Sequence, residues 1–591
     1  MKKRFPLLIA TMFASATLLS SSLYAAEGPG GTPPSGGPGG GADTMTYDYS
    51  GSLSGVITSD TEGGEYATDT ADQNVILASD GQTLTVSGVT LNKSGDDNNG
   101  DSCNFYGVNS IALAVGEGST LYLSDAVLNA DSTGSNAIFS TDNATVYAKD
   151  ITIATTSDNS RGLDATYGGT IIADGLAIST QGDHCAALAT DRGGGQISVT
   201  NSTLDTTGSG SPLIYSTGDI EVDNVTGTTS GSQIAGMEGL NTILIYNSDL
   251  TSTNTTTTGS DPVANGIILY QSTSGDAEAT TGDTATFQAV DSTLTSAIES
   301  GSFFYITNTS VDVLLSGTTL NFDSEAANLL QIEGNSANNW GSAGSNGANV
   351  TFTAIDETLS GDISVDTISS LDLYLTEGTT YTGAMNIITN ANGSTSDAPI
   401  VVNLDGTSTW IVTEDSTISQ LNVAEGASIV DSEGKTVTIL AGDETVAEGE
   451  SSLTVTVTGS YSQTVGTAGT VSDTFIDRSE FDSYYGTTTS YSTNGAFEEE
   501  PVQEETAEET EPAAEESSEE STEEESSDEE VIESSVEESS EESVESSEEE
   551  SSVEKAQPET SSSQASYLSW ILGGATALAL VLLLVLKLKK K

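Results

Sequence analysis

Positive charge is what this chain has least of. Its 591 residues contain 14 Lys and Arg against 88 Asp and Glu, a formal net charge of −74. Phosphate recognition needs a basic surface, so the composition excludes a nucleic-acid-binding protein. Neutral sugars and cations are easier partners for such a surface. The cations between residues 44 and 440 are Lys93, Lys149, Arg161, Arg192 and Lys435.

Residues that usually carry chemistry are also scarce. The chain has one histidine, His184, and no P-loop, HExxH, GxSxG, CxxC or dinucleotide-binding fingerprint. Residues 96–101 look like a calcium loop, but Gly95 stands where the first carboxylate should be and Tyr106 stands at the twelfth position. We therefore predict no cofactor, no metal site and no catalytic residue.

Helical periodicity is absent from about residue 44 to 490, and a recurring corner takes its place. Short alternating strands end at Asn, Asp or Gly, with steps of 25, 25, 26, 23 and 23 residues between the first six corners. These residue types tolerate left-handed backbone at low cost. The predicted corners are Asp125, Asp150, Gly175, Asn201, Asn224, Asn247 and Asp291.

Alternation on both sides of each corner predicts which side chains point inward. Val146 and Ala148 precede one corner on a single strand face, and Ile151 and Ile153 follow it. A unit this short cannot bury its own apolar face and must stack on copies of itself. Immunoglobulin-type sandwiches use units of about 100 residues and do not explain the step. We therefore predict an all-β fold, a right-handed parallel β-helix.

Two turns are expected to be long, Ser94 to Phe105 and Ser252 to Ala264, and excursions of this kind often form binding surfaces. Cys103 and Cys185 fall about three coils apart, roughly 14 Å at the usual strand spacing. A disulfide needs Cα atoms within about 7 Å. Only a fold-back of the first long turn would close the gap, so we predict two free thiols.

The two ends of the chain have the composition of targeting and anchoring segments. Lys2, Lys3 and Arg4 precede an apolar run, which predicts a secretory signal peptide. Near the other end, residues 567–586 are apolar and long enough to span a bilayer, and Lys587 to Lys591 follow as a basic cytoplasmic tail. We expect a cell-surface, single-pass membrane protein with its bulk outside. The expected divisions are a signal peptide at 1–26, a Gly/Pro-rich spacer at 27–43, the β-helix at 44–440, a small β cap region at 441–496, a disordered Glu/Ser-rich stalk at 497–566, the transmembrane helix and the tail.

A second interpretation of the C-terminal end stays open. Gln557, Pro558, Glu559, Thr560 and Ser561 precede the apolar run, an arrangement like that of a sortase signal. The usual motif is Leu-Pro-x-Thr-Gly, and both end positions differ here. Sortase processing would anchor the protein to the cell wall instead of leaving it in the membrane.

A polar cluster supplies the candidate ligand-binding residues. Arg161, Tyr167, His184, Asp191 and Arg192 gather scarce basic and aromatic groups on neighbouring coils. Arginine could clamp a sugar acid, and tyrosine could stack on a sugar face. The chance placement of Asp beside Arg on an acidic rod is the competing explanation.

Several short segments resemble a known group of proteins. They are Asn104 to Gly107, Asp191 to Gly195, Gly210 to Pro212 with Tyr215 and Ser216, and Asp477 and Arg478 with Phe481 and Tyr484 to Gly486. The chain resembles adhesin-like surface proteins of gut Clostridia and relatives. These are similar to adhesins and autotransporter passenger domains with a pectin-lyase-like β-helix. The resemblance implies the architecture and no defined activity. We expect a surface adhesin that binds an extracellular glycan or protein; the alternative is a polysaccharide lyase or glycoside hydrolase on the same scaffold.

Overall fold

The computed structural model describes residues 46–259, 261–272, 277, 284–338, 340–393, 399–442, 444–489 and 491. The predicted signal peptide, spacer, stalk, transmembrane segment and basic tail lie outside the described residues, and so does the sortase-like segment 557–561.

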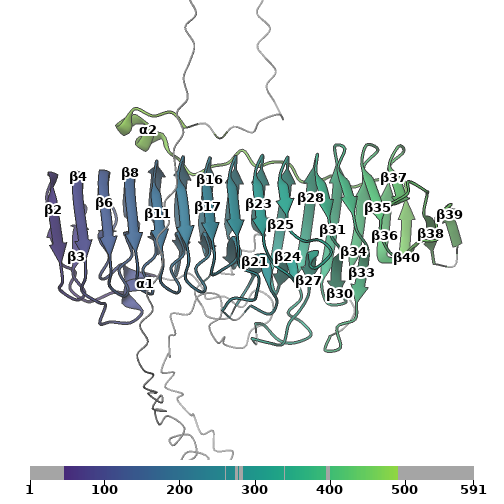
Figure 1. Cartoon of the computed structure of the whole chain (residues 1–591), viewed down its shortest axis with the longest axis horizontal. Helices are drawn as coiled ribbons and strands as arrows, with labels where there is room; N and C mark the ends of the chain where they lie inside the picture. The colour runs from purple at the N-terminus through teal and green to yellow at the C-terminus, as the bar shows by residue number, and fades with distance from the viewer. Residues whose placement is uncertain are drawn as a thin grey trace, which may run out of the picture. The chain divides into compact units, whose positions relative to one another are not determined.

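The described chain is a β-solenoid in which each coil stacks on the one before it (Figure 1). Each coil contributes strands to three rows, and nearly all strand pairs are parallel; the exceptions among the described residues are β38 with β39 and one isolated bridge. Four long strands contain a corner and so belong to two rows: β2 (Thr61–Thr68), β4 (Thr83–Lys93), β6 (Thr120–Ala130) and β8 (Thr145–Thr155).

The remaining strands fall into rows by their position in the coil. Before the corner lie β10 (Gly169–Asp174), β13 (Gly195–Thr200), β16 (Asp219–Asp223), β19 (Thr242–Tyr246), β22 (Ala285–Val290), β25 (Ser310–Ser316), β28 (Asn349–Ile355), β31 (Ser370–Thr376) and β34 (Ile400–Leu404). After the corner lie β11 (Ala177–Thr180), β14 (Thr203–Thr206), β17 (Thr226–Thr229), β20 (Asp249–Ser252), β23 (Thr293–Ser296), β26 (Thr319–Asn321), β29 (Thr358–Ser360), β32 (Thr380–Thr382), β35 (Thr409–Val412) and β37 (Ser428–Asp431). The third row is β1 (Gly55–Ile57), β3 (Asn74–Ala78), β5 (Ala112–Val115), β7 (Ile138–Thr141), β9 (Leu163–Ala165), β12 (Leu188–Thr190), β15 (Ile214–Ser216), β18 (Ala235–Glu238), β21 (Asn265–Tyr270), β24 (Ser302–Thr307), β27 (Asn328–Ile332), β30 (Ile363–Asp366) and β33 (Met385–Ile388).

The predicted corners are confirmed by their backbone. All seven have positive φ, from 47° at Asn247 to 71° at Gly175. Neighbouring corners are also linked, since Asn224 Nδ2 donates to Asn201 Oδ1 at 2.7 Å. Asparagine therefore adopts the left-handed turn and joins the coils through its side chain.

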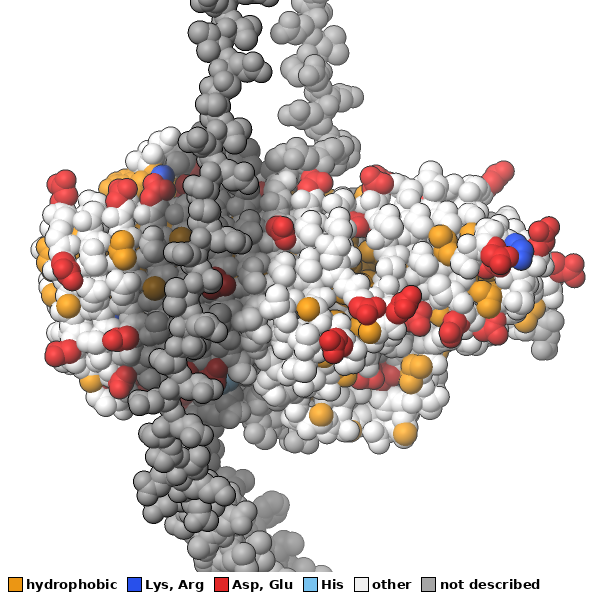
Figure 2. Space-filling view, viewed as in Figure 1, with side chains coloured by type: hydrophobic (Ala, Val, Ile, Leu, Met, Phe, Trp, Pro, Cys, Tyr) orange, Lys and Arg blue, Asp and Glu red, His pale blue; other side chains and the backbone are white. Residues whose placement is uncertain are grey.

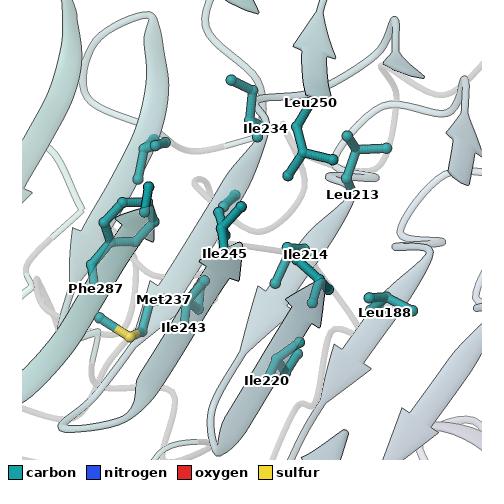
Figure 3. Close-up of a cluster of buried hydrophobic side chains, with 14 of the residues drawn as sticks. Leu188, Leu213, Ile214, Ile220, Ile234, Met237, Ile243, Ile245, Leu250 and Phe287 are labelled. Atoms are coloured by element: carbon teal, nitrogen blue, oxygen red, sulfur yellow. The ribbon is translucent and has the colours of Figure 1, made fainter. Parts of the chain in front are cut away.

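The core is a continuous apolar column inside the coils. Val146, Ala148, Ile151 and Ile153 are each at most 1% exposed, as the alternation predicts. Figure 3 shows the same stacking further along, where Ile220, Ile243 and Phe287 occupy equivalent positions in successive coils. Each coil thus buries its apolar residues against those of its neighbours.

The predicted cap region is wrong in two respects. Strand β40 (Thr454–Ser462), in the predicted cap region, belongs to the rod, because it pairs in parallel with β36 (Ser416–Val423) and β38 (Thr438–Ala441). The solenoid therefore extends past residue 440, and only β39 (Glu444–Ala447) turns back antiparallel on β38.

The second error concerns residues 463–491, which we call the strap. The strap does not close the open end; it runs back along the outside of the rod, from Gly466 at Asn403 to Tyr484 at Tyr122. Its helix α2 (Ser479–Tyr485) lies on the N-terminal half of the rod (Figure 1). The physical reason is a column of outward aromatic and polar side chains on the strands before the corner, which contacts the strap along the rod.

Candidate functional site

The third row of strands is bordered by long loops on both sides. Residues 94–111, with helix α1 (Ser102–Tyr106), and residues 253–264 enter this row, confirming both predicted long turns. Further segments leave this row after β21, β27 and β33, and these were not predicted. The described parts of these segments, including α1, lie along the lower edge of the rod in Figure 1, whereas the strap follows the upper edge. We call strands β5 to β33 of the third row the loop-flanked row.

Strand register aligns polar and aromatic side chains along the loop-flanked row. Tyr215 stands next to Gly236 on the neighbouring strand, and Tyr305 stands next to Gln331. Carboxylates recur where the strands end, at Asp191, Glu238, Glu333 and Asp366. The exposed face in Figure 2 carries scattered Asp and Glu and very few Lys or Arg.

Arg161 is the centre of a buried ion network on this row. Its guanidinium donates to Asp164 Oδ2 at 3.2 Å, Asp191 Oδ2 at 3.1 Å and Asn104 Oδ1 at 2.8 Å. Asn104 comes from α1, so the first long loop folds back over the network. Arg161 is 7% exposed, and Asp164 is fully buried. We call these four residues the Arg161 network.

The charges of this network do not balance, because one guanidinium faces two buried carboxylates. Burial raises the pKa of Asp164 well above its usual value; Arg161 opposes this shift and Asp191 adds to it. The network therefore holds the loop to the coils, and the Arg161 side chain is occupied by protein partners instead of facing solvent.

Two other predicted residues, Tyr167 and Arg192, lie beside the network. Tyr167 has positive φ and stacks on Tyr106 with ring centroids 5.5 Å apart. Tyr47 packs edge-on against both rings. The Arg192 guanidinium lies over the Phe105 ring, 3.8 Å from its centroid. Both residues thus contact α1, and Arg192 stays partly exposed.

His184 takes a different position from the other four. It occupies the turn that enters β12, with a φ of 59°, and its ring lies against Gly210 of the next coil. Its side chain is partly exposed. The structure therefore brings Arg161 and Asp191 into direct contact, with Tyr167 and Arg192 against the same loop, and places His184 at a turn.

The cysteines are free, as predicted, and both are buried. Burial raises the pKa of Cys185 to about 12, so its thiol stays protonated. In the calcium-like segment, Asp96 accepts a hydrogen bond from Thr133 N at 2.9 Å. No cluster of three or more His, Cys, Asp or Glu side chains suited to a metal occurs within the described ranges.

A second polar and aromatic group on this row was missed from the sequence. Glu238 is 2% exposed and accepts hydrogen bonds from Tyr215 Oη at 3.1 Å and from Ser272 Oγ. Further along, Glu333 accepts from Tyr305 Oη at 3.4 Å. Burial is the main cause of a raised pKa at Glu333, and Asp366 adds to it. Counting outward positions from each corner would have aligned these residues.

The open part of the row lies between the loops at 333–348 and 389–399. The outward side chains of Gln331, Ser364 and Asn386 are adjacent in register and partly exposed there. Asp366 is 3% exposed and accepts four hydrogen bonds, from Gly334 N, Ile368 N, Ser369 Oγ and Asn390 Nδ2. This stretch can donate and accept hydrogen bonds, while Asp366 is saturated by protein donors.

No family model, no curated protein and no solved structure matches this chain. Among the residues that the structure describes, none of the helices has the length and apolar character needed to cross a membrane.

Proposed function

We propose that this protein is a surface-displayed, adhesin-like β-solenoid that attaches to an extracellular glycan or protein. The observation that carries the proposal is the loop-flanked row, where Gln331, Ser364 and Asn386 form a partly exposed polar strip between two long loops. Amide and hydroxyl groups suit neutral polar ligands such as sugars, and the acidic surface disfavours anionic ones. Rigid scaffolds commonly carry binding residues beside loops of this kind.

The remaining parts of the proposal come from the sequence. Secretion follows from the signal peptide, display from the Glu/Ser-rich stalk, and attachment from the apolar segment or from sortase processing. A right-handed winding of the coils belongs to the same proposal, since it is the common hand of parallel crossovers. Protease added to whole cells should release the rod by cutting the stalk; protection of the stalk in intact cells would refute the orientation.

Binding is tested with purified protein on mucin and a glycan array. Replacing both Gln331 and Asn386 with Ala should abolish measurable binding, because the strip would lose its amides. Arg192→Ala and His184→Ala test the partly exposed residues predicted from the sequence. Thr228→Ala, on an exposed position of β17 away from this row, is the matched control. Unchanged binding by the double variant would refute this assignment.

A glycan-degrading activity is the second candidate, and one observation favours it. Glu333 has a raised pKa and lies near the carboxylate of Asp366, an arrangement that could supply a general acid. Release of reducing or unsaturated sugar ends, lost in Glu333→Gln, would make the protein an enzyme. We favour binding because Asp366 is buried and fully hydrogen-bonded, so it is poorly placed to act as the second catalytic group.

A further inference from the structure

The strap follows a single column of outward side chains. Gly466 N donates to Asn403 Oδ1 at 3.3 Å, Gly469 N donates to Thr353 Oγ1 at 3.3 Å, and Ser472 N donates to Gln288 Oε1 at 2.9 Å. These partners occupy the same register position in β34, β28 and β22. We call this set the strap column. Its members include Tyr122, Tyr147, Ile172, Ser198, Glu221, Leu244, Gln288, Leu314, Thr353, Tyr374 and Asn403.

The contacts are made by side chains and single backbone groups. Residues 463–478 form no strand with the rod. The strap is therefore docked on the sheet face and is not a further strand of the sheet. Such docking resembles peptide recognition in a groove, where a few pockets supply the affinity.

Arg478 is the deepest anchor of the strap. It is 5% exposed, and its guanidinium donates to Ser198 O at 2.9 Å, Ser198 Oγ at 2.8 Å, Ala173 O at 3.0 Å and Thr200 Oγ1 at 3.1 Å. All four acceptors belong to the rod. A buried guanidinium that donates hydrogen bonds to two coils at once gives a specific docking geometry, because its planar donors are fixed in direction.

A second anchor surrounds Glu221 of the rod. Its carboxylate accepts from Ile476 N at 3.0 Å and from Tyr491 Oη, and it is 2% exposed. Tyr491 stacks on Phe475 with centroids 4.1 Å apart, and both rings pack edge-on against Tyr246. The strap thus doubles back on itself between residues 475 and 491.

The third anchor is α2. Tyr484 stacks on Tyr122 with centroids 3.9 Å apart, and Tyr122 Oη donates to Glu480 Oε1 at 3.1 Å. Tyr485 Oη donates to Tyr147 O at 3.2 Å. The last described residue, Tyr491, therefore lies at β13 to β19 and not at the C-terminal end of the coils.

We propose that residues 471–491 are a peptide clasp docked in a seam of the rod, and that this docking holds whatever follows Tyr491 to the rod independently of the covalent link at residues 463–466. The seam is an interaction surface whose partner is a segment of this same chain, recognised by the Arg478 pocket and the aromatic pairs. The docking itself does not depend on the proposed adhesion. A consequence for display does rest on the proposed function: the rod would be held at the position of Tyr491, along its side, and not at its last coil.

The test cuts the covalent link and asks whether the clasp holds. A recognition sequence for a specific protease is inserted between Thr464 and Val465 of the full chain, and the cleaved protein is passed over a sizing column without denaturant. We expect the C-terminal fragment to co-elute with the rod and to separate only in denaturant. Separation of the two fragments in native buffer would overturn the proposal. Failure of glycan binding would leave this result unchanged, so the two proposals are tested separately.

Single substitutions test how much the Arg478 and Tyr484 anchors contribute to the docking. Arg478→Ala should raise the dissociation rate of the cleaved fragment at least tenfold, and Tyr484→Ala should raise it less. Lys435→Ala, which removes a rod cation that pairs with the exposed carboxylate of Glu433, is the control. Should Arg478→Ala fail to fold, exchange of the cleaved fragment against a fluorescent 471–491 peptide gives the same answer: exchange should occur with the native peptide and not with one that carries Arg478→Ala. Equal exchange of both peptides would refute the role of the Arg478 pocket.

Discussion

Two outward faces of the same solenoid have different partners. The strap column is covered by a distant part of its own chain, and its buried polar atoms are paired by Arg478, Ile476 N and Tyr491. The loop-flanked row is covered only in places, by loops that enter or leave its own strands. It keeps a partly exposed polar strip at Gln331, Ser364 and Asn386.

The difference shows that outward positions in a solenoid are not equivalent. Inward residues repeat because each coil packs on a copy of itself. An outward residue depends on what comes to cover it, and that is set far away in the sequence: Ser198 and Arg478 are 280 residues apart. A covered face adds stability, and an open face leaves room for a ligand. Four predictions test this contrast.

The largest effect is expected in the covered part of the loop-flanked row. Arg161→Ala leaves Asp164 and Asp191 buried without their cation, which should cost about 3–5 kcal/mol of unfolding free energy. Denaturant unfolding at pH 7 measures it. Lys435→Ala removes an exposed pair and should change stability by less than about 1 kcal/mol. A loss below 1 kcal/mol for Arg161→Ala would mean that the network does not hold the loop.

The second effect concerns pH and Asp261, in the loop that enters β21. Burial raises the pKa of Asp261 to about 7 from 3.8, while a hydrogen bond from Asn265 opposes the shift. The folded state therefore binds this proton more tightly than the unfolded state. Its contribution to stability is complete below about pH 4 and is lost as pH rises through about 7.

Asp261→Asn should remove that loss and stabilise the protein at pH 8 by on the order of 2–4 kcal/mol. Unfolding at pH 4 and pH 8 measures it, and the variant should show a smaller difference between the two than the native chain. The exposed Asp205→Asn is the control. An unchanged pH dependence would mean that Asp261 is hydrated in solution.

The third prediction tests the corners that both faces share. Asn224 has a φ of 54°, so Asn224→Ala should cost about 1–2 kcal/mol, since a Cβ without a local hydrogen bond disfavours left-handed backbone. Asn224→Gly should cost less, because glycine adopts this conformation freely. The measurement is the thermal midpoint of each variant. Equal losses would assign the cost to the side-chain ladder with Asn201 and not to the backbone.

The smallest effect is expected at the end of the strap. Tyr484 is 47% exposed and stacks on Tyr122. Tyr484→Ala should cost about 0.5–1.5 kcal/mol, and hydrogen exchange should increase in α2 but not in the loop-flanked row. Thr228→Ala should leave exchange unchanged at both places. Increased exchange across the whole rod would show that strap and coils unfold as one unit.

The solenoid could be predicted because its signal is local and repeated. Each corner, from Asp125 to Asp291, lies within one coil of its alternating apolar residues, so sequence spacing alone identifies the inward set. The contact of Arg161 with Asp191 could also be predicted, since the two residues lie at the third row of successive coils. The third-row group at Glu238 and Glu333 carries no sequence signal of its own, because acidic residues are common in this chain and their alignment depends on outward register.

The strap could not be predicted in the same way. Nothing near Arg478 indicates that its acceptors are Ser198 and Ala173, because a single copy has no period to detect. A cap was predicted for 441–496, because an open coil end exposes strand edges that are ordinarily covered. The choice between the end and the side depends on three-dimensional complementarity to Tyr122 and Tyr147, which spacing along the chain does not encode.

The length of the strap also constrains the number of coils that it spans. Gly466 and Ser472 are six residues apart, and their partners lie four strands apart, on β34 and β22 with β31, β28 and β25 between. Six extended residues reach about 20 Å, and four strand spacings measure about 19 Å, so this stretch is nearly taut. A coil inserted within this stretch would therefore require one or two added strap residues, whereas a coil inserted before β4 would require none. Added or deleted coils should be tolerated only outside the part of the rod that the strap spans, unless the length of the strap changes as well.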